Sequence, residues 1–370
     1  MNRITAFFLL LTLCSASAIA QDISNPRALI FVGDQSENLI DVISVNSSEV
    51  VYRIETSIRP DHILATPFAP ILIYSDIQAK KLVFYDLQNK RESKTIDLPF
   101  VPLHMVLDTS GSKIGISNDV EGGFALVYPF DQRIEFSLSD FPPSPAVLFD
   151  PNEVDIYYSN GTAGTIGILN TNTEERYEIP VTDEPGQVLT APSRSLDGRY
   201  IYIGNVTSGE VYSLNAYSGA IFKTFDVGGA LARPYTTPEG VFLYMMDQEN
   251  GRMITIEQHG FTQYADVSFG QGIDLVTVGR FDHLNLFTSS ENNQWSIYDN
   301  IKKSVTKQGE FSGQPIGALG SADGKLAYVA LQGSAEIAVV NLEKGSVDYI
   351  PATNNGSGAF TLGLSNNVCH

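Results

Sequence analysis

The sequence predicts an all-β fold, a β-propeller, because strand patterns dominate it and recur with a nearly constant period. Short runs rich in Ile, Val, Tyr and Phe alternate with turns that contain Gly, Asp or Asn, at intervals of roughly eight to twelve residues. No stretch carries a convincing helical period. A strand-based period in the low forties is typical of propeller blades, each of which is a four-stranded sheet.

The repeat consists of a turn followed by a short apolar strand that usually ends in Ser, Asn or Asp. Seven segments of this kind start at residues 67, 109, 151, 196, 238, 281 and 322, with spacings of 42, 42, 45, 42, 43 and 41 residues. Within each unit, two further alternating strands follow, as in EVYSLN and AIFKTFDV after the segment at 196. These patterns predict four-stranded antiparallel blades.

The two ends of the chain indicate how the ring closes. NPRALIFVGD, from residue 25, matches the repeat but has no innermost strand before it, whereas GAFTLGLS (358–365) looks like an innermost strand without a blade of its own. We therefore predict that the C-terminal strand completes the blade begun at the N-terminus. On this count the propeller has seven blades and no open sheet edge.

The first twenty residues, MNRITAFFLLLTLCSASAIA, predict a secretory signal. One arginine precedes an apolar stretch, and small residues end at Ala20, the expected cleavage site. A lipoprotein would use Cys14, but the bulky Leu13 before it disfavours that alternative. We expect 1–20 to be removed and 21–370 to form a single propeller domain in the periplasm or outside the cell. No later run of eighteen apolar residues predicts a membrane span.

Composition restricts the partners. The formal net charge is −19, from 42 acidic and 23 basic residues, and no basic cluster is present. Such a chain is not expected to bind nucleic acid or anionic membranes. It suits solubility and cationic or basic ligands, although a general acidity of the source organism's proteins explains the charge equally well.

Cys369 is the only cysteine after residue 20, so the expected stabilisation is a hydrophobic core rather than a disulfide.

Three stretches carry a family resemblance: SNGTAGTIGILNTNT (159–173), GNVTSGEVYSLNAYSG (204–219) and SADGKLAYVALQGSAEIAVVNLEKG (321–345). They resemble the YVTN-type propeller repeat, in which a D-G turn, an aromatic strand, an Asn and a Gly-containing hairpin follow one another. The resemblance covers nearly all of 21–370, but the segments at 67 and 281 lack the D-G turn and no blade spells the family's tetrapeptide. The family and its relatives, the lactonase-like and quinoprotein amine dehydrogenase propellers, imply a seven-bladed fold more firmly than any activity.

The expected site is the mouth of the central channel, where the first strand of each blade begins. Counting five residues back from each aligned turn gives one position per blade, and these positions should form a ring: His62, His104, Ala146, Ala191, Arg233, Val276 and Gly317. The ring places two histidines in adjacent blades. Asp61 stands beside the first of them, and Asp274 lies two residues before the ring position of its own blade.

This ring has two interpretations. In the first, His62 and His104 are metal ligands or acid–base groups, Asp61 is a third ligand or an orienting carboxylate, and Arg233 clamps an anion from the opposite side. Neutral imidazoles suit zinc or copper, so a divalent metal is the one cofactor considered. In the second, the histidines are half-buried polar residues at strand starts, hydrogen-bonded to loop carbonyls. Two histidines do not by themselves establish a metal site.

The last six residues, SNNVCH, and the absent motifs complete the survey. Asn366 stands where a c-type haem motif needs its first cysteine, so no haem is expected. The repeat places Cys369 and His370 at the opposite face of the channel from the two ring histidines; they form either a surface thiol site or a dispensable terminus. The sequence has no Walker loop and no dinucleotide-binding, zincin or nucleophile-elbow motif, so no nucleotide is expected either.

Recurrent polar residues end the second strands: Asp34, Asp76, Asn118, Asn160, Asn205 and Asp247. Their repetition at one structural position predicts capping of the following turn rather than calcium binding.

The sequence favours a binding or interaction scaffold over an enzyme, because the ring is mostly small or apolar and catalytic sites gather more polar groups. The ligand or partner, a small molecule or a protein, would bind at the channel mouth. The alternative is a lactonase-like hydrolase or an amine-dehydrogenase-like subunit that uses a metal or a His–Asp pair there.

Overall fold

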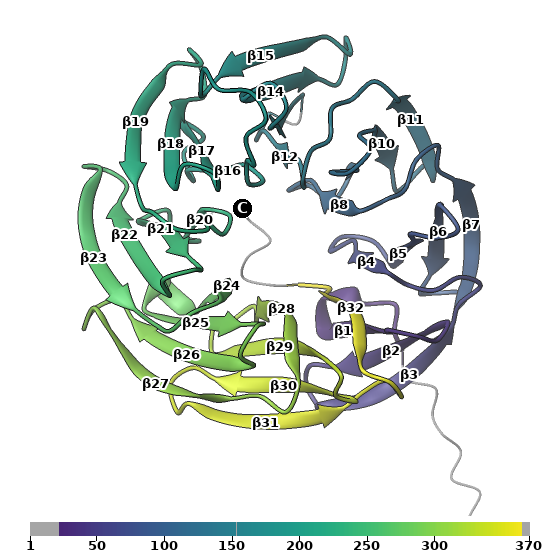
Figure 1. Cartoon of the computed structure of the whole chain (residues 1–370). Helices are drawn as coiled ribbons and strands as arrows, with labels where there is room; N and C mark the ends of the chain where they lie inside the picture. Colours follow the sequence, from purple (N-terminus) through teal and green to yellow (C-terminus); the bar gives the residue numbers. More distant parts are fainter. Residues whose placement is uncertain (1–21, 153, 365–370) are drawn as a thin grey trace, which may run out of the picture.

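The computed structural model describes residues 22–152 and 154–364, which form a ring of four-stranded antiparallel sheets around a central channel (Figure 1). The predicted β-propeller is confirmed, but the described residues form eight blades, so the prediction of seven is wrong. Each of the seven segments from 67 to 322 belongs to a blade with an innermost strand of its own. The blade shared by the two ends of the chain is therefore an additional, eighth blade.

The first four blades occupy the N-terminal half of the ring. Blade 1 contains β1 (Leu29–Asp34), β2 (Leu39–Ser44), β3 (Glu49–Glu55) and β32 (Ser357–Leu362), and blade 2 contains β4 (His62–Ala65), β5 (Ile71–Asp76), β6 (Lys81–Asp86) and β7 (Arg91–Asp97). Blade 3 contains β8 (His104–Leu107), β9 (Ile114–Ser117), β10 (Phe124–Tyr128) and β11 (Arg133–Leu138). Blade 4 contains β12 (Leu148–Phe149), β13 (Asp155–Asn160), β14 (Thr165–Asn170) and β15 (Arg176–Pro180).

The other four blades follow in chain order. Blade 5 contains β16 (Ser193–Arg194), β17 (Tyr200–Asn205), β18 (Glu210–Asn215) and β19 (Ile221–Asp226), and blade 6 contains β20 (Tyr235–Thr236), β21 (Phe242–Asp247), β22 (Arg252–Glu257) and β23 (Thr262–Ser268). Blade 7 contains β24 (Ile273–Val278), β25 (Leu284–Ser289), β26 (Gln294–Asp299) and β27 (Ser304–Glu310). Blade 8 contains β28 (Gln314–Gly320), β29 (Leu326–Gln332), β30 (Glu336–Asn341) and β31 (Ser346–Pro351).

Apolar second and third strands explain why the blades pack as they do. The interior of β6 is buried, whereas β7, the outermost strand of the same blade, is largely exposed and polar. Adjacent sheets bury their apolar faces against each other, as where Phe31 and Ile40 of blade 1 meet Leu72 and Val83 of blade 2. Complete burial of one such side chain contributes about 1.5–3 kcal/mol. Packing between blades therefore stabilises the ring and fixes the innermost strands around the channel.

Blade 1 closes the ring, as predicted, by pairing the two ends of the chain. β32 is antiparallel to β1, with Ile30 opposite Leu362 and Gly33 opposite Ala359. The closure loop, which we define as residues 353–356, leads into β32 and is held by two carboxylates. Asp34 accepts hydrogen bonds from the backbone N–H groups of residues 354 and 355, and Asp41 accepts one from that of residue 353.

Turn capping by the second strands is confirmed. The side-chain oxygens of all six predicted residues accept a backbone N–H from two or three residues further on: Asp34 from Ser36, Asp76 from Ala79, Asn118 from Val120, Asn160 from Ala163, Asn205 from Thr207 and Asp247 from Asn250. These side chains satisfy donors that the tight turns leave unpaired.

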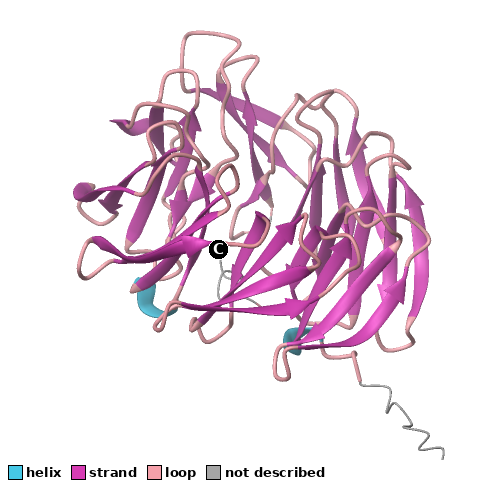
Figure 2. Cartoon of the chain, turned by 60° about the horizontal axis from the view of Figure 1, so that its bottom comes forward, coloured by secondary structure: helices cyan, strands magenta, loops and turns pink. Residues whose placement is uncertain are grey.

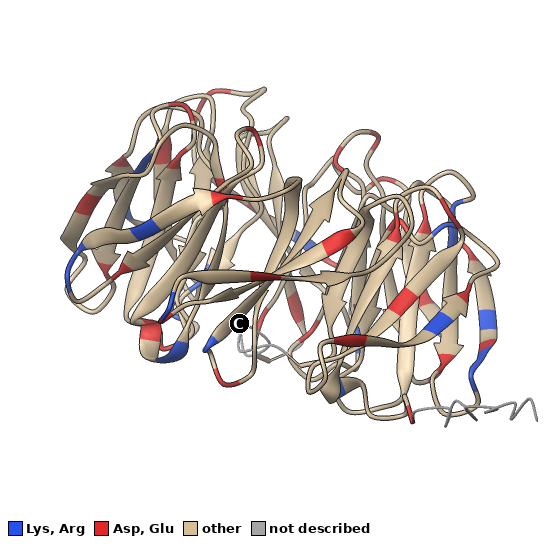
Figure 3. Cartoon of the chain, turned by 90° about the horizontal axis from the view of Figure 1, so that it is seen from below, with Lys and Arg blue, Asp and Glu red and all other residues tan. Residues whose placement is uncertain are grey.

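Helices contribute little to the described part of the chain. It contains two 3-10 turns, η1 (Pro26–Ala28) and η2 (Arg280–Asp282), beside the strands (Figure 2). Within the same residues, no helix has the length and apolar character needed to traverse a bilayer. Acidic and basic residues are spread over the loops and strands of the ring (Figure 3). The predicted signal segment 1–20 lies outside the described residues.

Candidate functional site

The channel mouth is formed where the innermost strands begin. β4 starts at His62 and β8 starts at His104, so both histidines lie at this end of their blades, as the repeat predicted. The ring has an eighth position, which the sequence survey missed because β32 supplies it. Ala359 is paired with Gly33 in blade 1 just as His62 is paired with Ser75 in blade 2.

A cavity of about 450 Å³, the mouth pocket, opens on one side of the channel. Innermost strands of blades 1, 2 and 8 form most of its wall. Three of the residues that the sequence singled out line it, namely Asp61, His62 and Gly317. Met105, Gln332 and the β32 residues Ser357 to Phe360 also contribute to the lining, and none of them was predicted. This volume lies in the usual range for a small-molecule site.

His62 is the most perturbed titratable group of the mouth pocket. Its Nε2 atom is buried and has no hydrogen-bond partner among the described residues. Burial lowers the pKa of His62, and the nearby His104 lowers it further, while Asp61 and backbone groups of residues 102 and 103 act in the opposite direction. A lowered pKa keeps the imidazole neutral at pH 7, which is the form that can accept a proton or bind a metal.

Asp61 is already engaged by neighbouring groups of its own blade. One carboxylate oxygen accepts a hydrogen bond of 2.7 Å from Nε of Arg59, and the other accepts one of 2.8 Å from the N–H of Ile77. It therefore fixes the turn that leads into β4. An orienting role beside His62 fits this geometry better than a role as a free metal ligand.

His104 and Asp274 form other contacts. Nε2 of His104 lies 3.1 Å from a carboxylate oxygen of Asp119, and the side chain is 31% exposed. The carboxylate of Asp274 accepts hydrogen bonds from the backbone and the hydroxyl of Ser290, next to the turn between β25 and β26. Burial raises the pKa of Asp274, and the bonds from Ser290 partly offset that rise. Neither side chain is among the residues that line the mouth pocket.

A second cavity, the arginine pocket, lies on another part of the channel wall. It has a volume of about 150 Å³ and is lined by Leu148, Ser193, Arg194 and the segment from Arg233 to Thr236. β20, which begins two residues after Arg233, lies across the channel from β4 (Figure 1). Arg194, from the adjacent blade 5, was not predicted.

The described residues contain no group of three or more His, Cys, Asp and Glu side chains placed to hold a metal ion. The two ring histidines are close enough for the charge of one to act on the other, but neither gathers a third ligand of this kind. Cys369 and His370 lie outside the described residues. A metal bound here would therefore need water or an added ligand to complete its coordination.

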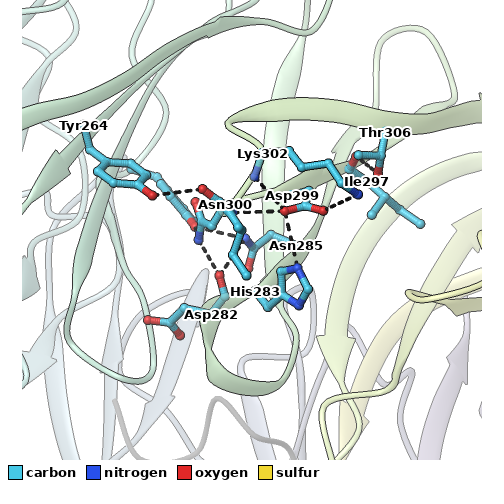
Figure 4. A network of polar contacts seen from close by, with 11 residues as sticks. Tyr264, Asp282, His283, Asn285, Ile297, Asp299, Asn300, Lys302 and Thr306 are labelled. Atoms are coloured by element: carbon cyan, nitrogen blue, oxygen red, sulfur yellow. Dashed lines mark hydrogen bonds and ion pairs between the residues drawn. The ribbon is translucent and has the colours of Figure 1, made fainter.

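A polar cluster at the opposite face of blade 7 has a structural role (Figure 4). Nδ2 of Asn300 donates to the hydroxyl of Tyr244 at 2.6 Å, and Nδ2 of Asn285 donates to the same hydroxyl at 3.0 Å. Asp299 accepts the backbone N–H of Lys302 and lies 3.3 Å from Nε2 of His283. Asn285 and Asn300 also donate to the carbonyl oxygen of Asp282, so the cluster joins the η2 turn to blade 7 and, through Tyr244, to blade 6. Tyr244 stacks on Tyr235 of the arginine pocket, with ring centroids 6.3 Å apart.

Comparisons with known proteins show the fold. No family model matches the chain, so the YVTN assignment gains no support there, and no curated protein matches either. Among solved structures, it is similar to the dihydro-heme d1 dehydrogenase NirN in complex with DHE, at 12% identity over 94% of this chain and 77% of that one, with a TM-score of 0.76.

Two more solved structures are similar over shorter stretches. Hydrazine synthase of Kuenenia stuttgartiensis is 15% identical, covering 79% of this chain and 95% of its own, with a TM-score of 0.56. The β-propeller domain of Myceliophteria thermophila Cps50 (Swd1) is 12% identical, covering 80% and 98%, with a TM-score of 0.59. At these identities the likeness establishes a β-propeller scaffold and no activity.

Proposed function

We propose that this protein is an exported binding propeller whose channel mouth holds a small-molecule ligand. One observation carries the proposal: the mouth pocket of about 450 Å³ brings His62, Asp61 and residues of β32 together from separate blades. Ligand sites are concave and combine apolar walls with polar groups that orient the ligand. This pocket sets the polar side chains of Asp61, His62 and Gln332 among apolar ones such as Leu64 and Phe360. The predicted signal segment supports export to the periplasm or beyond.

A larger side chain at Gly317 can fill part of the mouth pocket. A Cβ atom added at Gly317 would lie 3.6 Å from Cδ1 of Phe360, an ordinary van der Waals distance. A larger side chain at this position therefore extends from a strand that tolerates it and occupies space on the pocket wall.

We expect Gly317→Leu to remove ligand binding while the protein keeps its fold. Immobilised wild-type protein and the variant are incubated with the low-molecular-mass fraction of a cell extract, and retained molecules are quantified by mass spectrometry. The matched control is Gly260→Leu, which adds the same side chain in the exposed turn between β22 and β23, where the added Cβ would meet only side-chain atoms of Glu257 and Thr262. A molecule retained by wild type and control but lost from Gly317→Leu supports the proposal; identical retention by all three contradicts it.

A metal-dependent enzyme is the second candidate, favoured by the unpartnered Nε2 of His62 at the channel mouth, where His104 begins the innermost strand of the next blade. On this second candidate, zinc should bind in a stoichiometric ratio and the His62→Ala/His104→Ala variant should lose that binding, as measured by isothermal titration calorimetry. His62 and His104 belong to none of the apolar clusters between the blades, so both can be replaced while that packing is kept. If wild type and the double variant bind zinc equally weakly, the metal site is refuted and the scaffold remains.

A further inference from the structure

The arginine pocket differs in charge from the rest of this acidic protein. Two guanidinium groups, from Arg194 in β16 and Arg233 just before β20, line a single cavity of about 150 Å³. The chain has a net charge of −19, so two cations that line the same small pocket stand against its overall composition.

Neither arginine is neutralised by a partner within the described residues. Most other arginines of the described chain form ion pairs with carboxylates within 4.0 Å, namely Arg53, Arg59, Arg133, Arg176, Arg199 and Arg252. Arg194 and Arg233 are not among them. Nη2 of Arg233 donates to the carbonyl oxygen of Pro192 at 2.6 Å, and Nη1 of Arg194 is buried without a hydrogen-bond partner.

Both arginines of the pocket are partly desolvated. Burial lowers the pKa of Arg194, and the more distant Asp150 and Tyr157 only partly oppose it. Desolvation at the channel wall also lowers the pKa of Arg233, with Tyr235 in partial opposition, although the Arg233 side chain keeps access to solvent and so can meet a ligand that enters the channel. Both groups stay charged at neutral pH, because arginine is not deprotonated in proteins. The buried Nη1 donor of Arg194 lacks an acceptor, which is costly, so a ligand that supplies acceptor oxygens there would be bound favourably.

We propose that the arginine pocket binds the oxyanion group of a small organic acid, a carboxylate or a phosphate, through Arg194 and Arg233. The planar guanidinium presents paired N–H donors that match the spacing of carboxylate and phosphate oxygens. The cavity has the volume of roughly five water molecules, enough for one such group, and Leu148 and Pro234 supply apolar walls for the carbon next to it. This inference rests on the proposed function, since it names the chemical class of a channel ligand.

The test measures binding of succinate and of inorganic phosphate by isothermal titration calorimetry at low ionic strength. We expect at least one of them to bind the full wild-type chain and its affinity to fall by roughly 10- to 100-fold when an arginine is replaced, as in Arg233→Gln or Arg194→Gln. Succinamide, which has the same shape without charge, is expected not to bind. Binding of succinate alone assigns a carboxylate ligand, and binding of phosphate alone assigns a phosphorylated one.

Matched variants separate the pocket from general charge effects. The control Arg91→Gln/Arg199→Gln removes the same charge as Arg194→Gln/Arg233→Gln from exposed positions and should bind like wild type. Thermal unfolding identifies variants that fold, and if the double variant does not fold, the single variant Arg233→Gln decides the matter. If wild type binds neither anion, or a folded arginine variant binds it as tightly as wild type, the inference is overturned.

The failure of this inference is distinguishable from failure of the proposed function. Gly317→Leu fills the mouth pocket and leaves the arginines unchanged, so anion binding should persist in it. If the arginine variants have no effect while Gly317→Leu still removes a retained molecule, the anion site alone is rejected. If anions bind through the arginines while Gly317→Leu retains every molecule, the mouth-pocket proposal alone is rejected.

Discussion

A chain that ends at Gly356 is expected to lose its cooperative fold, because this truncation removes β32. All six residues of β1 are buried, and without β32 one edge of that strand has unpaired backbone groups next to the channel. The truncation also removes Ala359 and Leu362 from the apolar contacts of blade 1. The combined loss amounts to several kcal/mol, a large part of a typical stability of about 5–15 kcal/mol.

The truncation is checked by thermal unfolding and size-exclusion chromatography. A chain that lacks only 365–370 keeps the whole of β32 and should unfold like wild type. Adding a synthetic peptide of residues 353–364 to the chain truncated at Gly356 should restore part of its stability, since the peptide can pair with β1. A truncated chain that unfolds at the wild-type temperature would show that β32 is dispensable for closure.

The second large effect concerns Asp34, which holds the turn after β1 and the closure loop together. Its side chain is fully buried, and burial alone would raise its pKa, but backbone N–H groups of Ser36, Asn354, Asn355 and Glu37 outweigh burial and hold the pKa at about 2. The pKa in the unfolded chain is near the ordinary value of 3.8. A depressed pKa stabilises the folded state above pH 4, and this contribution disappears as the pH falls from about 4 to 2.

Asp34→Asn should therefore lower the free energy of unfolding at pH 7 by about 2 kcal/mol. The difference from wild type should shrink as the pH is lowered toward 2, which urea unfolding at several pH values measures. Asp86→Asn is the matched control, because Asp86 caps a turn of blade 2 in the same way but on the surface. Its effect should stay within about 0.5 kcal/mol. A difference between Asp34→Asn and wild type that does not vary with pH would rule out this role of the charge.

Local patterns made most of the fold predictable. Turn residues and alternating strands recur along the chain, and Asp76 or Asn205 at the end of a strand indicates the same capped turn each time. Closure by the C-terminal strand was predicted correctly, but the number of blades was wrong, because the seven segments from 67 to 322 were counted without the blade that the two chain ends share. The segment from 25 and the C-terminal strand are one blade in space, and a count along the chain from residue 67 leaves that blade out.

The site was predictable only as far as strand register determines it. The repeat placed His62 and Gly317 at the same level of the channel, and both line the mouth pocket. The repeat could not show that His104 lies against Asp119. Strand register places the two residues in the same blade, but whether their side chains meet depends on side-chain conformation. Arg194 was missed because it lies three residues beyond Ala191, the ring position of its blade. A charged residue on a short innermost strand was nevertheless a signal that could have been used.

The pairing of β1 with β32 sets the order of events during synthesis. Asp34 and Asn355 are hydrogen-bonded although 321 residues separate them, so blade 1 waits for nearly the whole polypeptide to leave the ribosome. Blades 2 to 8 are each contiguous in sequence and can form as they emerge. Long-range pairing of this kind slows the final step of folding. The nascent chain therefore exposes the unpaired edge of β1 until its last segment is synthesised. This is the interval in which the chain is most prone to aggregate and in which a chaperone would be most useful.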